Sequence, residues 1–150
     1  MTGWRVGFAV GNPEVLALLG KVKSNIDSGI FQAIQMAAKK ALEDGETAHE
    51  EILTIYQRRR DLLIQGLQQL GWNAKPQQAT FYCWLPVPPG YTSAELTLKF
   101  LDEMNIVVTP GNGFGANGEG YFRISLTVAD ARLEEALKRI EKSHHHLHSK

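Results

Sequence analysis

The stretch Tyr121-Phe122-Arg123-Ile124-Ser125-Leu126 alternates between apolar and polar side chains. A period of two is typical of a β-strand with one buried face, so Phe122, Ile124 and Leu126 are predicted to face the core. Arg123 then points to the opposite face, where its planar guanidinium can bind a carboxylate through two parallel hydrogen bonds. The same pattern suits an arginine that faces solvent or joins a salt bridge, so the stretch alone leaves both interpretations open.

Around this strand, the second half of the chain has the pattern of an α/β layer with helices over one face of a short sheet. The predicted strands span 80–85, 106–109 and 121–126, and the predicted helices span about 92–105 and 133–140. Thr92 followed three residues later by Glu95 has the form of a capping box, which predicts where the first of these helices begins. The fold class predicted here is therefore α/β.

The first half of the chain predicts one strand and three helices. Alternation over 4–10 predicts a strand, and Asn12 followed by Pro13 is typical of an N-cap and the first residue of a helix that runs to about Lys23. Apolar stripes with the helical period predict two further helices, over about 30–42 and 48–70.

A loop rich in glycine and asparagine, 111–120, connects two of the predicted strands. Gly111-Asn112-Gly113-Phe114-Gly115-Ala116 fits the dinucleotide pattern G-x-G-x-x-G/A nominally. That fingerprint requires a helix that begins in the loop, whereas a strand follows here. The loop is instead predicted to be a tight connection that brings backbone close to a site.

Composition excludes several classes of function. The chain has 150 residues, 43% hydrophobic and 21% charged, which are ordinary values for a globular domain. Sixteen basic and sixteen acidic residues cancel, so no global field favours nucleic acid or an acidic membrane. The sequence has no apolar run long enough to span a membrane and no signal-peptide layout at its start. We therefore expect a cytoplasmic protein without nucleic-acid or membrane partners.

Other candidate groups favour structural interpretations. Cys83 stands alone in an apolar run and is predicted to be a buried, inert thiol. Arg58-Arg59-Arg60 is predicted to lie on a helix face and to pair with nearby acids. The tract His144-His145-His146 with His148 follows the last predicted helix, so adventitious metal binding is the expected behaviour and no metal site is predicted.

Two segments carry a resemblance to a known family. The run Met1-Thr2-Gly3-Trp4-Arg5-Val6-Gly7-Phe8 resembles the segment that follows the cofactor lysine in class I/II aminotransferases, the fold type I enzymes that use pyridoxal phosphate. The run Gly120-Tyr121-Phe122-Arg123-Ile124-Ser125 resembles the segment that carries their substrate-binding arginine. Within that family, 26–33 and 107–112 are similar to the LL-diaminopimelate aminotransferase branch.

The resemblance implies a role for two arginines. Arg5 would contact the phosphate of pyridoxal phosphate, and Arg123 would bind the α-carboxylate of an amino acid or 2-oxo acid substrate. It also implies a homodimer that moves an amino group between these substrates. Without the resemblance, an arginine at a strand end that pairs with a carboxylate remains the alternative for Arg5.

The cofactor lysine has no counterpart at its expected place in this sequence. Counting back from Arg5 to the family position of the Schiff-base lysine passes Met1, so we expect that lysine upstream, together with the aspartate at the pyridine nitrogen. Lys21, Lys23, Lys39 and Lys40 all fall on predicted helices and are unsuited to replace it. The chain is expected to be the C-terminal part of the enzyme and inactive alone. A catalytically inactive module for carboxylate binding or dimerisation is the alternative.

The resemblance also implies a division of the chain. Residues 1–48 would be a remnant of the large cofactor-binding domain, with its last strand and connecting helices. Residues 49–142 would form the C-terminal small domain, and 143–150 would be a disordered histidine-rich tail. The first region would then expose apolar surface and an unpaired strand edge.

Overall fold

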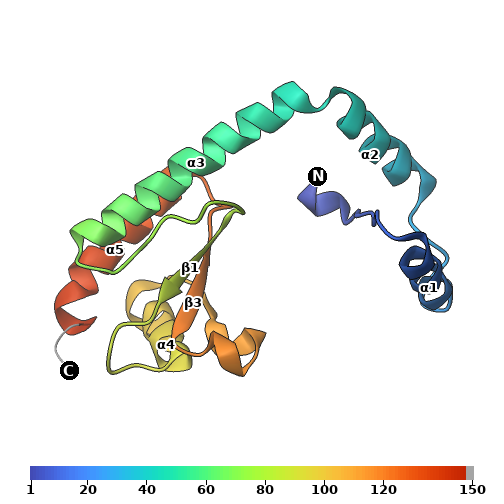
Figure 1. Cartoon of the computed structure of the whole chain (residues 1–150). Coiled ribbons are helices and arrows are strands. Elements are labelled where there is room, and N and C mark those ends of the chain that lie inside the picture. The colour runs from blue at the N-terminus through green and yellow to red at the C-terminus, as the bar shows by residue number, and fades with distance from the viewer. Residues whose placement is uncertain (148–150) are drawn as a thin grey trace. The chain divides into compact units, whose positions relative to one another are not determined.

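The computed structural model describes the backbone of residues 1–147 and divides the chain into two compact units, Met1–Glu51 and Ile52–Lys150. Three helices occupy or enter the first unit: α1 (Pro13–Ser24), α2 (Gln32–Asp44) and the beginning of α3 (Glu46–Gln69), as Figure 1 shows. All three were predicted from the sequence. The Asn12 side chain accepts hydrogen bonds from the backbone of Glu14 at 2.8 Å and Val15 at 3.3 Å, which confirms the predicted N-cap.

The strand predicted over 4–10 is not formed. A short 3₁₀-helix occupies Thr2–Trp4, and the residues that follow have no regular structure up to α1. The apolar side chains of Trp4, Phe8 and Val10 are 54%, 75% and 82% exposed. Alternation predicts which face of a strand is buried, but a strand also needs a neighbour for its backbone hydrogen bonds. No described strand of this chain pairs with this segment.

The second unit contains a three-stranded antiparallel sheet in the order β1-β3-β2. Its strands are β1 (Tyr82–Pro86), β2 (Thr109–Pro110) and the central β3 (Tyr121–Ser125). The strand predicted over 106–109 is reduced to 109–110. Asn105 ends helix α4 in the left-handed conformation with φ 53°, and the Ile106 amide still bonds the Phe100 carbonyl at 3.0 Å. The helix cap therefore uses the backbone that a longer strand would need.

Three helices cover one face of this sheet: the second part of α3, α4 (Ser93–Met104) and α5 (Asp130–Leu147). The register pairs Cys83 with Ile124 and Leu85 with Phe122, so these side chains share that face. The buried residues Leu67, Phe100 and Phe122 are fully enclosed and come from a different element each. Phe122 and Leu126 are buried and Ile124 packs against the core, so the predicted inward face of this strand is confirmed.

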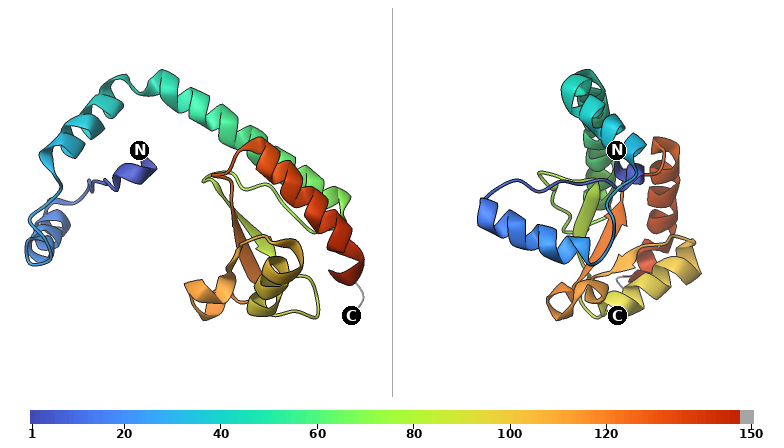
Figure 2. Two further views of the ribbon diagram at one scale, coloured as in Figure 1. Left: turned by 180° about the vertical axis from the view of Figure 1, so that it is seen from behind. Right: turned by 90° about the vertical axis from the view of Figure 1, so that its right-hand side faces the viewer.

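Helices α3 and α5 lie side by side, as Figures 1 and 2 show. A side chain at Gly66 of α3 would place its Cβ 2.5 Å from Leu137 Cδ1 of α5, so glycine permits the close approach of the two helices. The backbone of α5 continues to Leu147, through part of the predicted tail 143–150, and the last three residues of that tail lie outside the described residues. The side chains of His144-His145-His146 also lie outside the described part of the chain.

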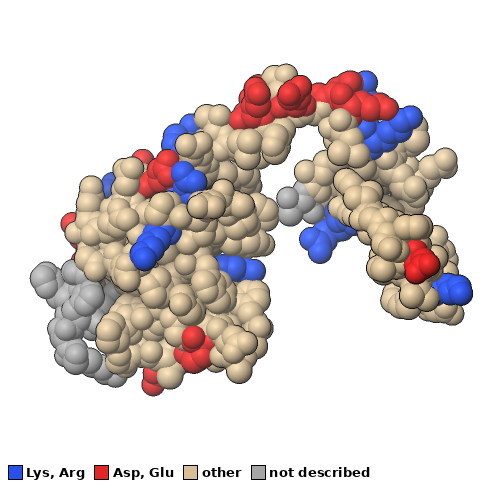
Figure 3. Space-filling view, in the orientation of Figure 1, with Lys and Arg blue, Asp and Glu red and all other residues tan. Residues whose placement is uncertain are grey.

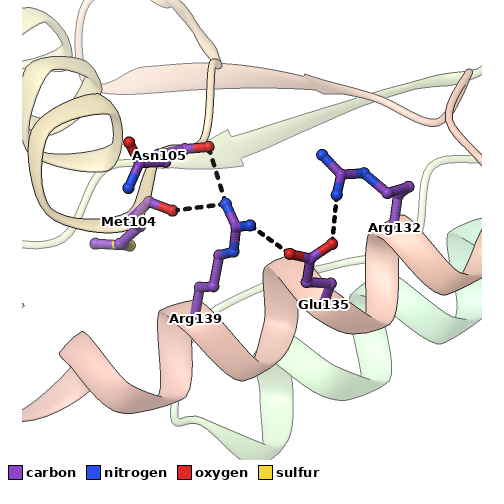
Figure 4. A network of polar contacts seen from close by, with 5 residues as sticks. All are labelled: Met104, Asn105, Arg132, Glu135 and Arg139. Carbon is purple, nitrogen blue, oxygen red and sulfur yellow. Dashed lines mark hydrogen bonds and ion pairs between the residues drawn. The ribbon is translucent and has the colours of Figure 1, made fainter.

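Ion pairs fasten α5 to its neighbours. Arg58 and Arg59 of α3 donate from Nε to the two carboxylate oxygens of Asp130, at 2.7 and 2.9 Å. The predicted pairing of this basic run with nearby acids is confirmed. A second contact joins α5 to α4. Arg139 pairs with Glu135 on its own helix and donates to the backbone carbonyls of Met104 and Asn105 at 3.2 and 3.3 Å, as Figure 4 shows. Those carbonyls stand at the end of α4, where a cation is favourable.

Acidic side chains gather where α2 gives way to α3, as Figure 3 shows. The residues there are Glu43, Asp44, Glu46, Glu50 and Glu51. Lys39 and Lys40 pair with Glu43 and Asp44 one helical turn away. These pairs are local to one helix and exposed, so each contributes little to stability.

Candidate carboxylate-binding site

Arg123 lies at the centre of the sheet face that the helices leave open. It is the middle residue of β3, the central strand, and its cross-strand neighbours are Trp84 on β1 and Thr109 on β2. Its predicted orientation away from the core is confirmed, because Phe122 before it is fully buried on the other face. The strand on each side restricts the backbone, so Arg123 extends from a rigid support.

Aromatic rings surround the guanidinium. The Arg123 Cζ atom lies 4.1 Å from the ring centroid of Tyr82 and 4.7 Å from that of Phe114. Trp84 meets Phe114 edge-on, with centroids 5.4 Å apart, and stacks on Tyr121 at 5.8 Å. Both contacts of the guanidinium are within the range of a cation–π interaction.

The donors of Arg123 have no internal acceptor among the described residues. Its guanidinium makes no hydrogen bond or ion pair with any described side chain or carbonyl, unlike Arg58, Arg59 and Arg139. The salt-bridge alternative left open by the sequence is therefore not realised in the described part of the chain. Five N–H groups in one plane remain able to bind an external carboxylate in a bidentate manner.

Two glycines hold the 111–120 loop in a tight shape. The loop forms two 3₁₀ turns, Gly111–Phe114 and Ala116–Gly118, and leads into β3. A Cβ at Gly111 would lie 1.9 Å from the Gly118 carbonyl oxygen, and one at Gly118 would lie 2.0 Å from the Gly111 carbonyl oxygen. The loop is therefore the close backbone connection that was predicted, and no helix begins in it that could receive a dinucleotide phosphate.

A polar contact between buried Ser93 and exposed Glu119 fastens this loop to α4. Ser93, fully enclosed at the first turn of α4, donates from its backbone amide and its hydroxyl to the two carboxylate oxygens of Glu119, at 2.7 and 2.9 Å. These hydrogen bonds, with one from the Gly120 amide, hold the pKa of the Glu119 carboxyl below its ordinary value. Glu119 thus ties the end of the loop to α4, and the Asn112 amide, 3.4 Å from the Ser93 hydroxyl, ties its beginning.

Arg5 lies in the first unit, and Arg123 lies in the second. Arg5 follows the Thr2–Trp4 turn in the left-handed conformation, with φ 53°, and its side chain is exposed. It makes no hydrogen bond or ion pair with any described residue. An exposed guanidinium with no partner among the described residues is able to pair with an external anion.

The lysines of the first unit lie on helices, as predicted. Lys21 and Lys23 are near the end of α1, and Lys39 and Lys40 are on α2. Lys23 pairs with Asp27, and the two lysines of α2 pair with carboxylates one turn away.

Cys83 is fully buried behind the site, in the core. Burial raises the pKa of its thiol to about 11, so the thiolate that reacts with electrophiles or metals is disfavoured. The predicted burial of this thiol is confirmed. Within the described residues no cluster of three His, Cys, Asp or Glu side chains is arranged to hold a metal ion, and no helix is long and apolar enough to cross a membrane.

Three aromatic residues of the site were not predicted to belong to it: Tyr82, Trp84 and Phe114. The period of two over 80–85 contained the signal for the first two, because it turns them away from Cys83 and Leu85. Their position beside Arg123 depends on the register between β1 and β3. Phe114 sits in a loop without periodicity, and no pattern in the sequence indicated its contact.

Comparison with known proteins identifies the family of this chain. The family model for aminotransferase class I and II matches residues 1–140, and the chain belongs to that family. The LL-diaminopimelate aminotransferase of Nitratidesulfovibrio vulgaris is 58% identical over 142 residues, which cover 95% of this chain and 37% of that protein. LL-diaminopimelate aminotransferase 2 of Nostoc sp. is 54% identical over 141 residues, or 94% of this chain and 36% of that protein.

The solved structures agree with the family assignment and with the predicted fold. An aminotransferase from Staphylococcus aureus matches with a TM-score of 0.88 and 36% identity, over 98% of this chain and 39% of that one. The α/β fold type I aminotransferase class that the sequence predicted is confirmed. The chain spans little more than a third of the length of the relatives that it matches.

Proposed function

We propose that this chain supplies the substrate-carboxylate arginine of an aminotransferase that moves an amino group between an amino acid and a 2-oxo acid. The observation that carries the proposal is the Arg123 guanidinium, which lies on a rigid central strand against two rings and has no acceptor among the described residues. A carboxylate that binds its N–H fork is fixed in both direction and rotation, because two parallel hydrogen bonds define a plane. Arg123 would thereby hold the α-carbon of the substrate in one orientation.

Arg5 is proposed to bind the phosphate of pyridoxal phosphate. The exposed guanidinium has no hydrogen-bond or ion-pair partner among the described residues, which supports this role. Gly3 and Gly7, two positions away in the sequence, add no side-chain bulk and leave room for an anion. When bound, the cofactor supplies the electron sink for the amino-group transfer. The lysine that anchors it is proposed to come from sequence that precedes Met1 or from another chain, and the active assembly is proposed to be a homodimer.

We further propose LL-diaminopimelate as the amino donor of the whole enzyme. The support for this choice is the 54–58% identity to proteins with that activity in their names. Arg123 would bind one of the two α-carboxylates of this substrate. Transamination assays on the assembled enzyme test the choice, and faster turnover of another amino acid would contradict it.

Carboxylate binding by the chain itself is tested by titration with 2-oxoglutarate, monitored through indole fluorescence. Trp84 is the cross-strand neighbour of Arg123 and should report the ligand. Arg123→Gln should weaken binding at least about tenfold, because charged hydrogen bonds contribute about 1.5–3 kcal/mol each. Arg132→Gln, an exposed arginine on α5, is the matched control and should bind as the wild type does. Equal affinity in all three proteins would contradict the proposal.

The origin of the cofactor lysine is tested separately. The purified chain is mixed with pyridoxal phosphate and reduced with borohydride, and any modified lysine is mapped by mass spectrometry. We expect absent or scattered labelling. Stoichiometric labelling of one lysine would show that the chain has an anchor of its own. Carboxylate binding that persists in an assembly without transaminase activity would instead favour an inactive binding module.

A further inference from the structure

Phe114 is a half-exposed aromatic residue that lies outside the core and beside Arg123. It is 52% exposed and lies on a loop, outside the core cluster of the second unit. Its ring contacts the Arg123 guanidinium at 4.7 Å and the edge of Trp84 at 5.4 Å. The ring therefore lies outside the core, where it contacts a cation and one other ring.

Among the described residues, the guanidinium has two ring contacts and no hydrogen bond or ion pair. Tyr82 lies on the neighbouring strand, and Phe114 comes from the 111–120 loop. A long side chain such as that of arginine has many rotamers, so an arginine without fixed partners samples several directions. Since no described acceptor restrains Arg123, the two rings are the contacts that favour one direction.

The loop under Phe114 is built to keep the ring in place. The Gly111 and Gly118 backbones approach too closely for any side chain, and the Glu119 carboxylate is fixed by Ser93 of α4. Phe114 thus stands on a segment restrained at both ends. A ring on an unrestrained loop would add no order to the guanidinium.

The contact leaves the donors of the arginine available. The Cζ atom lies over the Phe114 ring, 4.7 Å from its centroid, and the N–H groups of a guanidinium lie in its own plane, so a ring at its face does not consume them. An acidic partner would occupy these donors, but an aromatic ring stabilises the cation without consuming them. A ring therefore orders a carboxylate-binding arginine where a carboxylate side chain would block it.

We propose that Phe114 is a positioning residue, which holds the Arg123 guanidinium in the orientation that receives the substrate carboxylate. This inference rests on the proposed function of Arg123 as a carboxylate binder. Phe114 touches the arginine and needs no contact with the substrate. Its effect is preorganisation, which reduces the cost of ordering the arginine when the ligand binds.

The order of the guanidinium is measured directly by NMR of the chain with isotope-labelled arginine. In the wild type, the Arg123 Nε–Hε group should show the heteronuclear NOE of a rigid group and slow exchange with water. Phe114→Leu should lose both, Phe114→Tyr should keep both, and Phe31→Leu, an exposed phenylalanine of the first unit, should change neither. Unchanged order in Phe114→Leu would overturn the proposal. Absence of a ring-to-arginine NOE in the wild type would overturn it as well.

A titration with 2-oxoglutarate separates this inference from the proposed function. Phe114→Leu should bind about three- to tenfold more weakly than the wild type, and Phe114→Tyr should restore binding. A wild-type chain that binds no carboxylate although Arg123 is ordered would contradict the proposed function. A Phe114→Leu variant that binds as tightly as the wild type would contradict the positioning role.

Discussion

The two units of this chain use similar helices in different ways. In Met1–Glu51 no described residue is buried, and the apolar stripe of α1 lies open, with Val15 63% and Val22 60% exposed. In the second unit every α-helix contributes enclosed side chains to one core, among them Leu67, Phe100 and Ile140. Correct local signals are therefore enough to define a helix, but only packing against a second layer gives it tertiary stability.

The largest expected difference in stability between the two units comes from truncating one phenylalanine in each. Phe122→Ala, at a fully buried position, should destabilise the protein by about 3–5 kcal/mol, because it removes core contacts and leaves a cavity. Phe8→Ala, at a position 75% exposed, should change stability by less than about 0.5 kcal/mol. Urea unfolding followed by circular dichroism measures both. Equal losses would mean that the first unit has a core after all.

Two glycine substitutions in the 111–120 loop test whether the close backbone approach stabilises the site. Gly118→Ala should destabilise by about 1–3 kcal/mol, because its Cβ would lie 2.0 Å from the Gly111 carbonyl oxygen and the backbone must move. Gly113→Ala is the matched control, since nothing lies within 4 Å of its Cβ. Thermal unfolding compares the two. Gly118→Ala should also weaken carboxylate binding, and a tolerated Gly118→Ala would contradict the close approach.

Removal of the helix N-caps should lower the stability of one unit only, and by less than the substitutions above. Thr92 caps α4, whose Leu96 and Phe100 are in the core, so Thr92→Ala should lower global stability by about 1 kcal/mol. Asn12 caps α1, which buries nothing in this chain. Asn12→Ala should therefore reduce helical content without a shift in the urea midpoint. A comparable midpoint shift in both variants would show that α1 unfolds together with the core.

Acid titration should give the smallest effect. Hydrogen bonds from Arg58 and then Arg59 lower the pKa of Asp130 below its ordinary value of 3.8. Below pH 3.8 the Asp130 carboxyl takes up protons in the unfolded state before it does so in the folded state. The stabilisation by these ion pairs is therefore fully present above pH 3.8, and it is lost as pH falls through the lower pKa of the folded state. Asp130→Asn should lower the melting temperature near pH 7.

The matched control for this titration is Asp27→Asn. Asp27 also has a lowered pKa, through its hydrogen bond with Lys23, but that pair is local to the exposed region around α1. The Asp27→Asn substitution should therefore leave the melting temperature of the core unchanged. The difference between wild type and Asp130→Asn should shrink at acidic pH, and a difference that grew with acid would contradict the assignment.

Prediction from the sequence succeeded where the signal was local. The Asn12 cap and the Thr92–Glu95 capping box each involve residues within three positions, and both are formed as predicted. The strand over 4–10 was wrong, because a strand is completed by a partner that local alternation cannot supply. The strand over 106–109 shrank because the cap at Asn105 competes for the same backbone.

The sequence by itself determined the helices, their caps and the orientation of Arg123 away from the core, because these follow from the period of the backbone and from neighbours a few residues apart. Only the tertiary structure decided what surrounds that arginine. Tyr82 reaches it through the register of β1 and β3, and Phe114 reaches it through a loop whose shape depends on the meeting of Gly111 and Gly118. Such contacts join residues far apart in sequence, and packing of the whole unit is needed to bring them together.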